Sequence, residues 1–273
     1  MRRAEWAAVV IVGGVVAAVG TLIATAPRRP ASVVASAGDT SAATADSGAH
    51  STLDSSATVA LTTSQPAGGE LRYRVVRSGN TAPVRDRDEI RRHLALGAPG
   101  TYIGDVITKQ DSQLVRWPES TVFRVWIAPT TTATDWTPAY ADTVRKAFDA
   151  WTAAGAPIGA QFTTDSAAAN VRIHWVDRFA EGGTIGQTLQ TWDQHRWLVA
   201  GDITIATHTT GGQMLGADWV RACALHEIGH LFGLNHSSSP GDIMATEAHS
   251  LELSRADLAT LRLLYALPPG SVR

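Results

Sequence analysis

The segment from His226 to His236, which reads His-Glu-Ile-Gly-His-Leu-Phe-Gly-Leu-Asn-His, places the tightest constraint on how this chain of 273 residues folds. Residues four positions apart on an α-helix lie on one face, so His226 and His230 can direct their imidazole rings to one point. Gly233 can adopt a left-handed backbone conformation and end the helix. The segment therefore predicts a helix, a glycine turn and a return loop that brings His236 to the same point.

Three converging imidazole rings predict a metal site. Cys223 is the only cysteine, so no intrachain disulfide and no thiolate cluster can form within one chain. We interpret it as a small buried residue rather than a ligand. Neutral imidazoles suit zinc, and three protein ligands leave a fourth position open, which is typical of catalytic zinc sites. Glu227 directly follows the first histidine, where its carboxylate can reach a water molecule at the metal rather than the metal itself.

The same segment resembles the zinc-binding motif of metzincin metalloproteases. Met244 follows His236 by eight residues, a spacing similar to that of the Met-turn in the matrixin branch. The resemblance extends from Trp117 to Leu267. Its other matrixin-like stretches are Arg116-Trp117-Pro118, the helix around Ala147–Trp151, the strand Asn170–Trp175, Gly201-Asp202 and Leu264-Tyr265.

The resemblance implies an α+β, zincin-like metzincin catalytic domain. It would contain a twisted, mostly parallel sheet, an active-site helix at the floor of a cleft, and a C-terminal helix. The expected ligands of one catalytic zinc ion are His226, His230 and His236. Glu227 would then be the general base, Gly233 would form the turn, and Met244 would provide an apolar floor beneath the metal.

The implied function is that of a zinc-dependent endopeptidase, which hydrolyses peptide bonds of proteins or peptides with metal-activated water. By the same resemblance, the strand around Ile203 to Thr207 would be the sheet edge that pairs with an extended peptide. Two alternatives stay open: a catalytically idle peptide-binding module of the same fold, and a zinc hydrolase that acts on non-peptide bonds. The presence of Glu227 favours catalysis, because a pure binding module needs no base.

A second metal ion is not expected. Matrixins often carry a structural zinc ion bound by His and Asp residues before the active-site helix, but residues 183–187 and 201–205 lack the expected histidines. We interpret the remaining candidates as ordinary polar residues; they are His174, His195 and His208. The sequence does not decide whether calcium is bound.

Composition divides the chain into four segments. Residues 1–26 include an apolar run, Trp6 to Ala26, that is long enough to span a hydrocarbon core of about 30 Å and predicts a transmembrane signal anchor or a signal peptide. Residues 27–69 are rich in Ala, Ser and Thr and predict a disordered linker. Residues 70–116 form an N-terminal extension of unknown role, and residues 117–268 form the predicted catalytic domain.

These segments and the charge determine which partners we expect. With 23 basic and 25 acidic residues the formal net charge is -2, which provides no basic surface for nucleic acid. The expected partner is a protein or peptide substrate, and we expect the protein to be a monomer. The catalytic domain would lie outside the cytoplasm, attached to a membrane through the N-terminal segment, or secreted if that segment is cleaved.

Hydrophobic periodicity gives a coarse secondary structure. Strands are predicted at residues 71–76, 101–108, 121–127, 171–175 and 203–205. Helices are predicted at residues 85–93, 137–155, 218–232 and 254–265. We expect Asp218 to cap the helix that carries the histidines, and Ser254 with Asp257 to cap the last helix.

Overall fold

The structure, a computed structural model, describes residues 71–119, 121–180, 182–246 and 250–273. The membrane segment predicted for residues 1–26 and the linker predicted for residues 27–69 lie outside these ranges. Of the two units into which the chain divides, the first holds every described residue, and the second, Val15–Ala57, holds none. No helix within the described ranges is both long and apolar enough to cross a membrane.

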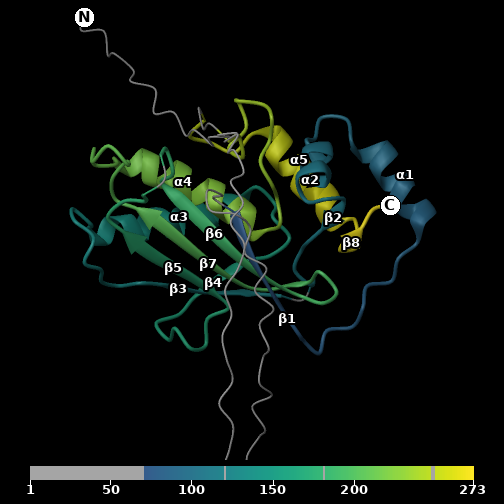
Figure 1. The fold of residues 1–273 in the computed structure, drawn as a ribbon, viewed down its shortest axis with the longest axis horizontal. Helices are drawn as coiled ribbons and strands as arrows, with labels where there is room; N and C mark the ends of the chain where they lie inside the picture. The colour runs from purple at the N-terminus through teal and green to yellow at the C-terminus, as the bar shows by residue number, and fades with distance from the viewer. Residues whose placement is uncertain (1–70, 120, 181, 247–249) are drawn as a thin grey trace, which may run out of the picture. The chain divides into compact units, whose positions relative to one another are not determined.

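A six-stranded sheet organises the fold, with its strands in the order β1-β6-β7-β5-β3-β4 (Figure 1). The strands are β1 (Leu71–Val76), β3 (Phe123–Ile127), β4 (Ala160–Phe162), β5 (Val171–Val176), β6 (Gly186–Asp193) and β7 (Leu198–Ala206). Neighbouring strands run parallel, except that β6 and β7 are antiparallel. The prediction of a mostly parallel sheet is therefore confirmed.

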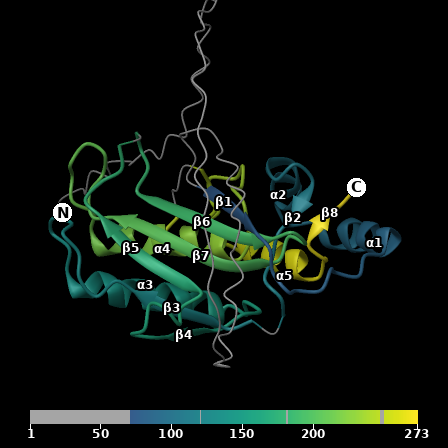
Figure 2. The same ribbon diagram turned by 60° about the horizontal axis from the view of Figure 1, so that its bottom comes forward.

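The described residues form five helices, which fall into two groups. They are α1 (Arg87–Gly97), α2 (Ile103–Lys109), α3 (Pro138–Ala153), α4 (Ala217–Leu231) and α5 (Arg255–Tyr265). The helices α3 and α4 pack together along the sheet, whereas α1, α2 and α5 gather at one end of it (Figures 1 and 2). A short antiparallel pair of strands, β2 (Gln113–Leu114) and β8 (Gly270–Ser271), joins the N-terminal extension to the C-terminus.

Two fully buried tryptophans fix α4 in the core. The indole N–H of Trp117 donates a hydrogen bond to the carbonyl oxygen of Leu231 (2.7 Å), and that of Trp151 donates to the carbonyl oxygen of Leu225 (3.0 Å). Phe232 packs against Trp151 with ring centroids 5.5 Å apart. The last two turns of α4 are thus held by hydrogen bonds as well as by apolar packing.

Several local predictions are confirmed. Pro138 stands at the start of α3, and its apolar positions are buried as the periodicity predicts. Ser254 and Asp257 form a reciprocal capping box at α5. Cys223 is a buried free cysteine.

Three predictions are wrong. Residues 101–108 do not form a strand, because Ile103 and Val106 lie at helical spacing and are both buried by α2. Asp218 does not cap α4, which begins after Gly216; the carboxylate lies in the first turn, where the helix dipole favours a negative charge. The strand around Ile203 to Thr207 is not a sheet edge, because β7 lies between β5 and β6.

The strand β6 was not among the predictions. Its sequence, Gly-Gln-Thr-Leu-Gln-Thr-Trp-Asp, alternates in no simple way, since several of its polar side chains are buried. Thr188, Gln190 and Asp193 are all nearly inaccessible to solvent. Each of these side chains forms a hydrogen bond inside the fold. The polar residues of β6 are therefore buried with hydrogen-bond partners and do not indicate an exposed strand.

The contribution of the Trp117 hydrogen bond can be measured. We expect Trp117→Phe to lower the free energy of unfolding by about 2–4 kcal/mol, because it leaves a buried carbonyl oxygen unpaired and a small cavity. Trp197→Phe is the matched control, since its indole N–H bonds to the carbonyl oxygen of Thr81 at an exposed site and should contribute about 1 kcal/mol or less. Urea unfolding of the full-length protein measures both, and equal losses would contradict the assignment.

Candidate metal centre

The helix α4 places the first two histidines. It is buried on nearly all faces from Val220 to Leu231, and His226 and His230 are 3% and 0% exposed. Their Nε2 atoms lie 3.1 Å apart on the same face of the helix. The spacing of four residues thus places the two ring nitrogens as the sequence predicts.

The return loop brings the third histidine to the same point. Gly233 has a φ of +103°, a left-handed conformation, and a Cβ atom there would collide with the carbonyl oxygen of Val115. Both conformation and space therefore require glycine at this turn. Beyond it, the Nε2 atom of His236 lies 3.2 Å from that of His230.

Two carbonyl oxygens determine which ring nitrogen faces the centre. The Nδ1 atom of His226 lies 2.7 Å from the carbonyl oxygen of Ile243, and that of His230 lies 3.0 Å from the carbonyl oxygen of Leu234. A carbonyl oxygen can only accept, so Nδ1 carries the hydrogen and donates it. In the neutral ring, Nε2 then has the lone pair that a metal ligand needs.

The distances fit a tetrahedral zinc ion. Zinc binds histidine nitrogen at about 2.0–2.1 Å, which places neighbouring ligand nitrogens in a tetrahedron roughly 3.3 Å apart. The Nε2 separations of 3.1 and 3.2 Å agree with that value. Within the described residues, one group of three such side chains has all its ligand atoms within 4.8 Å of one another; its members are His226, His230 and His236.

Glu227 lies beside the histidines on the same helix and is fully buried. Its Oε2 atom accepts a hydrogen bond of 2.6 Å from the hydroxyl group of Thr188 in β6. The strand approaches closely here, because a Cβ atom on Gly186 would collide with the carboxylate of Glu227 and with Cys223. The polar strand β6 thus determines where the carboxylate points.

Met244 packs against α4, and its role as an apolar floor beneath a metal ion stays a prediction. It is fully buried, and a Cβ atom on Gly229, one residue before His230, would collide with its sulfur atom. The backbone N–H groups of Ile243 and Met244 donate to the carboxylate of Asp257, at 3.0 and 3.4 Å. That carboxylate therefore holds the turn whose carbonyl oxygen orients His226.

Asp257 is in turn held by the N-terminal extension. The hydroxyl group of Tyr102 donates a hydrogen bond of 3.0 Å to its Oδ1 atom. Burial, and then the charge of Asp257, raise the pKa of Tyr102 well above its ordinary value, so this hydroxyl group stays a donor at neutral pH. The sequence indicated Asp257 only as a helix cap and gave no signal for Tyr102.

The helix α2 also contacts the loop that carries His236. Lys109 donates to the carbonyl oxygen of His236 (3.1 Å), and the side-chain amide of Gln110 donates to the carbonyl oxygen of Gly233 (3.2 Å). The carboxylate of Asp105 accepts from the backbone N–H of Ser238 (2.8 Å). An extension without any recognisable motif therefore supports the third histidine.

The other histidines lie apart from this group. His174 faces Asp202 at 3.6 Å and is partly exposed. His208 is buried between two carboxylates, 3.1 Å from Asp135 and 3.5 Å from Asp177. His195 bonds through its backbone N–H to Asp193. The expectation of a single zinc ion stays a prediction.

The site and its surroundings can be compared with known proteins. The matrixin family model matches residues 116–266. The chain belongs to the matrixin family. Metalloendoproteinase 1 from Glycine max is 28% identical to this matrixin over 145 residues, a match that covers 46% of the chain and 45% of that protein. This matrixin thus spans less than half the length of the curated relative.

The family confirms the metzincin prediction and the predicted fold class. It supports a zinc metalloendopeptidase as the general class of this matrixin, and zinc as the metal that its histidine cluster suits. The matched region begins at Arg116, so it includes the His236 loop but not α2, which contacts that loop.

The support from α2 predicts an effect on metal binding. We expect Gln110→Ala to weaken zinc binding about 3- to 10-fold, since one hydrogen bond contributes about 0.5–1.5 kcal/mol. Thr108→Ala is the matched control, because its hydroxyl group bonds only within α2, to the carbonyl oxygen of Gly104. Competition with a chelator of known affinity measures both variants. An unchanged affinity in Gln110→Ala would show that the loop needs no such support.

Proposed function

We propose that this matrixin is a zinc-dependent endopeptidase that hydrolyses peptide bonds of proteins or peptides. In this proposal His226, His230 and His236 bind the zinc ion, and Glu227 is the general base. The proposal is carried by one observation: the three Nε2 atoms converge while the carboxylate of Glu227 is fixed beside them by Thr188. Family membership supports the same class.

A zinc ion bound by the three histidines supplies Lewis acidity, which polarises a carbonyl group and acidifies water. Glu227 can accept the proton of the attacking water molecule and pass it to the leaving amine. Its fixed position matters, because proton transfer needs donor and acceptor within hydrogen-bond distance. Gln190 donates a hydrogen bond of 2.5 Å to the carbonyl oxygen of His230, which holds the last turn of α4 against β6.

The edge of β6 offers a place for a peptide backbone. Among the described residues, which begin at Leu71 on this side of the sheet, β1 pairs with β6 from Thr188 onward and pairs with neither Gly186 nor Gln187. Gly186 lies close to the carboxylate of Glu227, because a Cβ atom added at Gly186 would collide with that carboxylate. An extended peptide that pairs there would have its backbone beside the general base, which is recognition by β-augmentation.

Two other functions fit the structure less well. A peptide-binding module without activity would use the same edge of β6, but it would gain nothing from a buried carboxylate aligned with three histidines. A zinc hydrolase for non-peptide bonds shares the metal centre, and the sheet edge beside Glu227 favours a peptide over such substrates.

The proposal includes a location outside the cytoplasm. It rests on the apolar run from Trp6 to Ala26, which would deliver the remaining chain across a membrane and then either anchor it or be removed.

The assigned base can be tested separately from the metal. We expect Glu227→Gln to lower turnover of a fluorogenic peptide at least about 10²- to 10⁴-fold while zinc content stays unchanged, because the amide cannot accept a proton. His236→Ala is the control, since it should lose zinc and activity together. An undiminished rate in Glu227→Gln with zinc bound would remove Glu227 from the mechanism. Peptide binding without cleavage by the zinc-loaded wild type would favour the idle module.

A further inference from the structure

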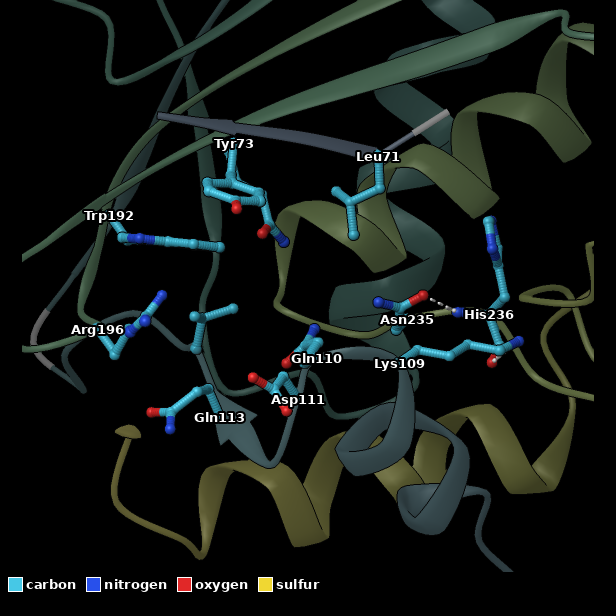
Figure 3. Close-up of a pocket in the computed structure, with 12 residues that line it drawn as sticks. Leu71, Tyr73, Lys109, Gln110, Asp111, Gln113, Trp192, Arg196, Asn235 and His236 are labelled. Carbon is cyan, nitrogen blue, oxygen red and sulfur yellow. Dashed lines mark hydrogen bonds between the residues drawn. The ribbon is translucent and has the colours of Figure 1, made fainter. Parts of the chain in front are cut away.

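A cavity of about 520 Å³ adjoins the candidate metal centre at His236 (Figure 3). Leu71 and Tyr73 project into it from β1, and Lys109 and Gln110 lie across from them. Its volume lies within the usual range of ligand pockets, about 300–1,000 Å³. Many of the residues that line the cavity come before residue 116, where the family match begins. The N-terminal extension therefore forms a large part of its wall.

The strand β1 restricts the path of a peptide along the sheet. Leu71 pairs with Thr188 and Val76 with Asp193, so β1 covers the outer edge of β6 from Thr188 onward. A peptide paired with β6 beside Glu227 meets β1 at Thr188 and must leave the sheet edge there. The cavity lies at that point, under the face of β1 that carries Leu71.

One part of the cavity wall is apolar and aromatic and suits a large side chain of the same kind, whereas the part across from it carries Lys109, Gln110 and Asp111. Tyr73 stacks on Trp192 with ring centroids 4.5 Å apart and planes inclined by 17°. Leu71 and Val115 add aliphatic surface. The guanidinium carbon of Arg196 lies over the Trp192 ring, 5.1 Å from its centroid, and Arg196 also lines the cavity. Aromatic and aliphatic walls of this kind bind side chains mainly by excluding water from both surfaces.

Two buried polar atoms in these walls are available to bind the polar groups of a peptide backbone. Gln190 is 1% exposed and Trp192 7%. The Oε1 atom of Gln190 and the Nε1 atom of Trp192 have no hydrogen-bond partner among the described residues. One is an acceptor and the other a donor, so together they match the N–H and C=O groups of a peptide.

The direction of the peptide follows from strand pairing. Antiparallel pairs are slightly more stable per residue than parallel pairs. The strand β6 runs from Gly186, beside Glu227, toward Asp193. An antiparallel peptide therefore runs from the cavity toward Glu227, and the residues in the cavity precede the cleaved bond.

We propose that this cavity binds the part of a peptide substrate N-terminal to the cleaved bond and selects a large apolar or aromatic side chain there. The proposal rests on the proposed endopeptidase function. It makes the N-terminal extension part of the substrate site and gives Leu71 and Tyr73 a role in specificity.

The test uses the full-length protein and a library of random peptides, with cleavage sites read by mass spectrometry. The wild type should enrich large apolar or aromatic residues N-terminal to the cleaved bond about 10-fold or more over alanine, as burial of such a side chain predicts. Leu71→Trp, which fills the cavity, should abolish this enrichment and leave the preference C-terminal to the bond unchanged. Arg74→Ala is the matched control on the exposed face of β1 and should change neither preference.

Zinc content and thermal unfolding report whether Leu71→Trp folds. If it does not, Leu71→Ala, which removes part of the wall, must lower the enrichment at least about threefold. Identical cleavage profiles in the wild type and a folded Leu71 variant would overturn the proposal, as would a preference for charged residues at these positions.

A binding experiment separates this proposal from the proposed function. The same library is passed over the Glu227→Gln variant with and without Leu71→Trp, and the retained peptides are sequenced. If the wild type cleaves no peptide, the endopeptidase proposal fails. The cavity proposal then stands only if Glu227→Gln retains peptides rich in large apolar residues and Leu71→Trp abolishes that enrichment. Retention of no peptides, or of the same peptides by both variants, overturns it.

Discussion

Two hydrogen bonds from imidazole rings to backbone carbonyl oxygens determine the candidate metal centre. They direct Nε2 of His226 and His230 to a common point, but each depends on a loop for its acceptor. Ile243 provides one acceptor, in the turn held by Asp257, and Leu234 provides the other, just beyond Gly233. The fold thus serves to fix two short loops against α4, because buried imidazole groups are tolerated only when their polar atoms are paired.

The extension reaches both loops. Tyr102 bonds to Asp257, and Gln110 bonds to the carbonyl oxygen of Gly233. A third anchor lies at the far end of β6, where the carboxylate of Asp193 accepts hydrogen bonds from Ser78 and Asn80. Residues that precede the matched family region are therefore integrated into the sheet, the metal centre and the cavity.

The sequence predicted the centre better than its surroundings, for physical reasons. Helical spacing and a turn glycine are local, so His226, His230, Gly233 and His236 could be placed without knowledge of the fold. Hydrophobic patterns did not predict β6, because several of its buried side chains are polar. Thr188, for example, is buried and forms a hydrogen bond inside the fold. Hydrophobic patterns also failed for α2, whose β-branched residues favour a strand locally but become buried on one helical face. The pairing of β1 with β6 joins residues far apart in the chain, which no local pattern specifies.

The central claim is that three imidazole Nε2 atoms bind one zinc ion, and X-ray absorption spectroscopy combined with elemental analysis tests it most directly. The account predicts one zinc ion per chain, with three imidazole nitrogens at about 2.0 Å and one oxygen ligand, such as water, in the open position. It predicts two imidazoles and a lower zinc content in His236→Ala. A zinc-free protein, or a bound zinc ion whose imidazole count is unchanged in His236→Ala, would contradict the account.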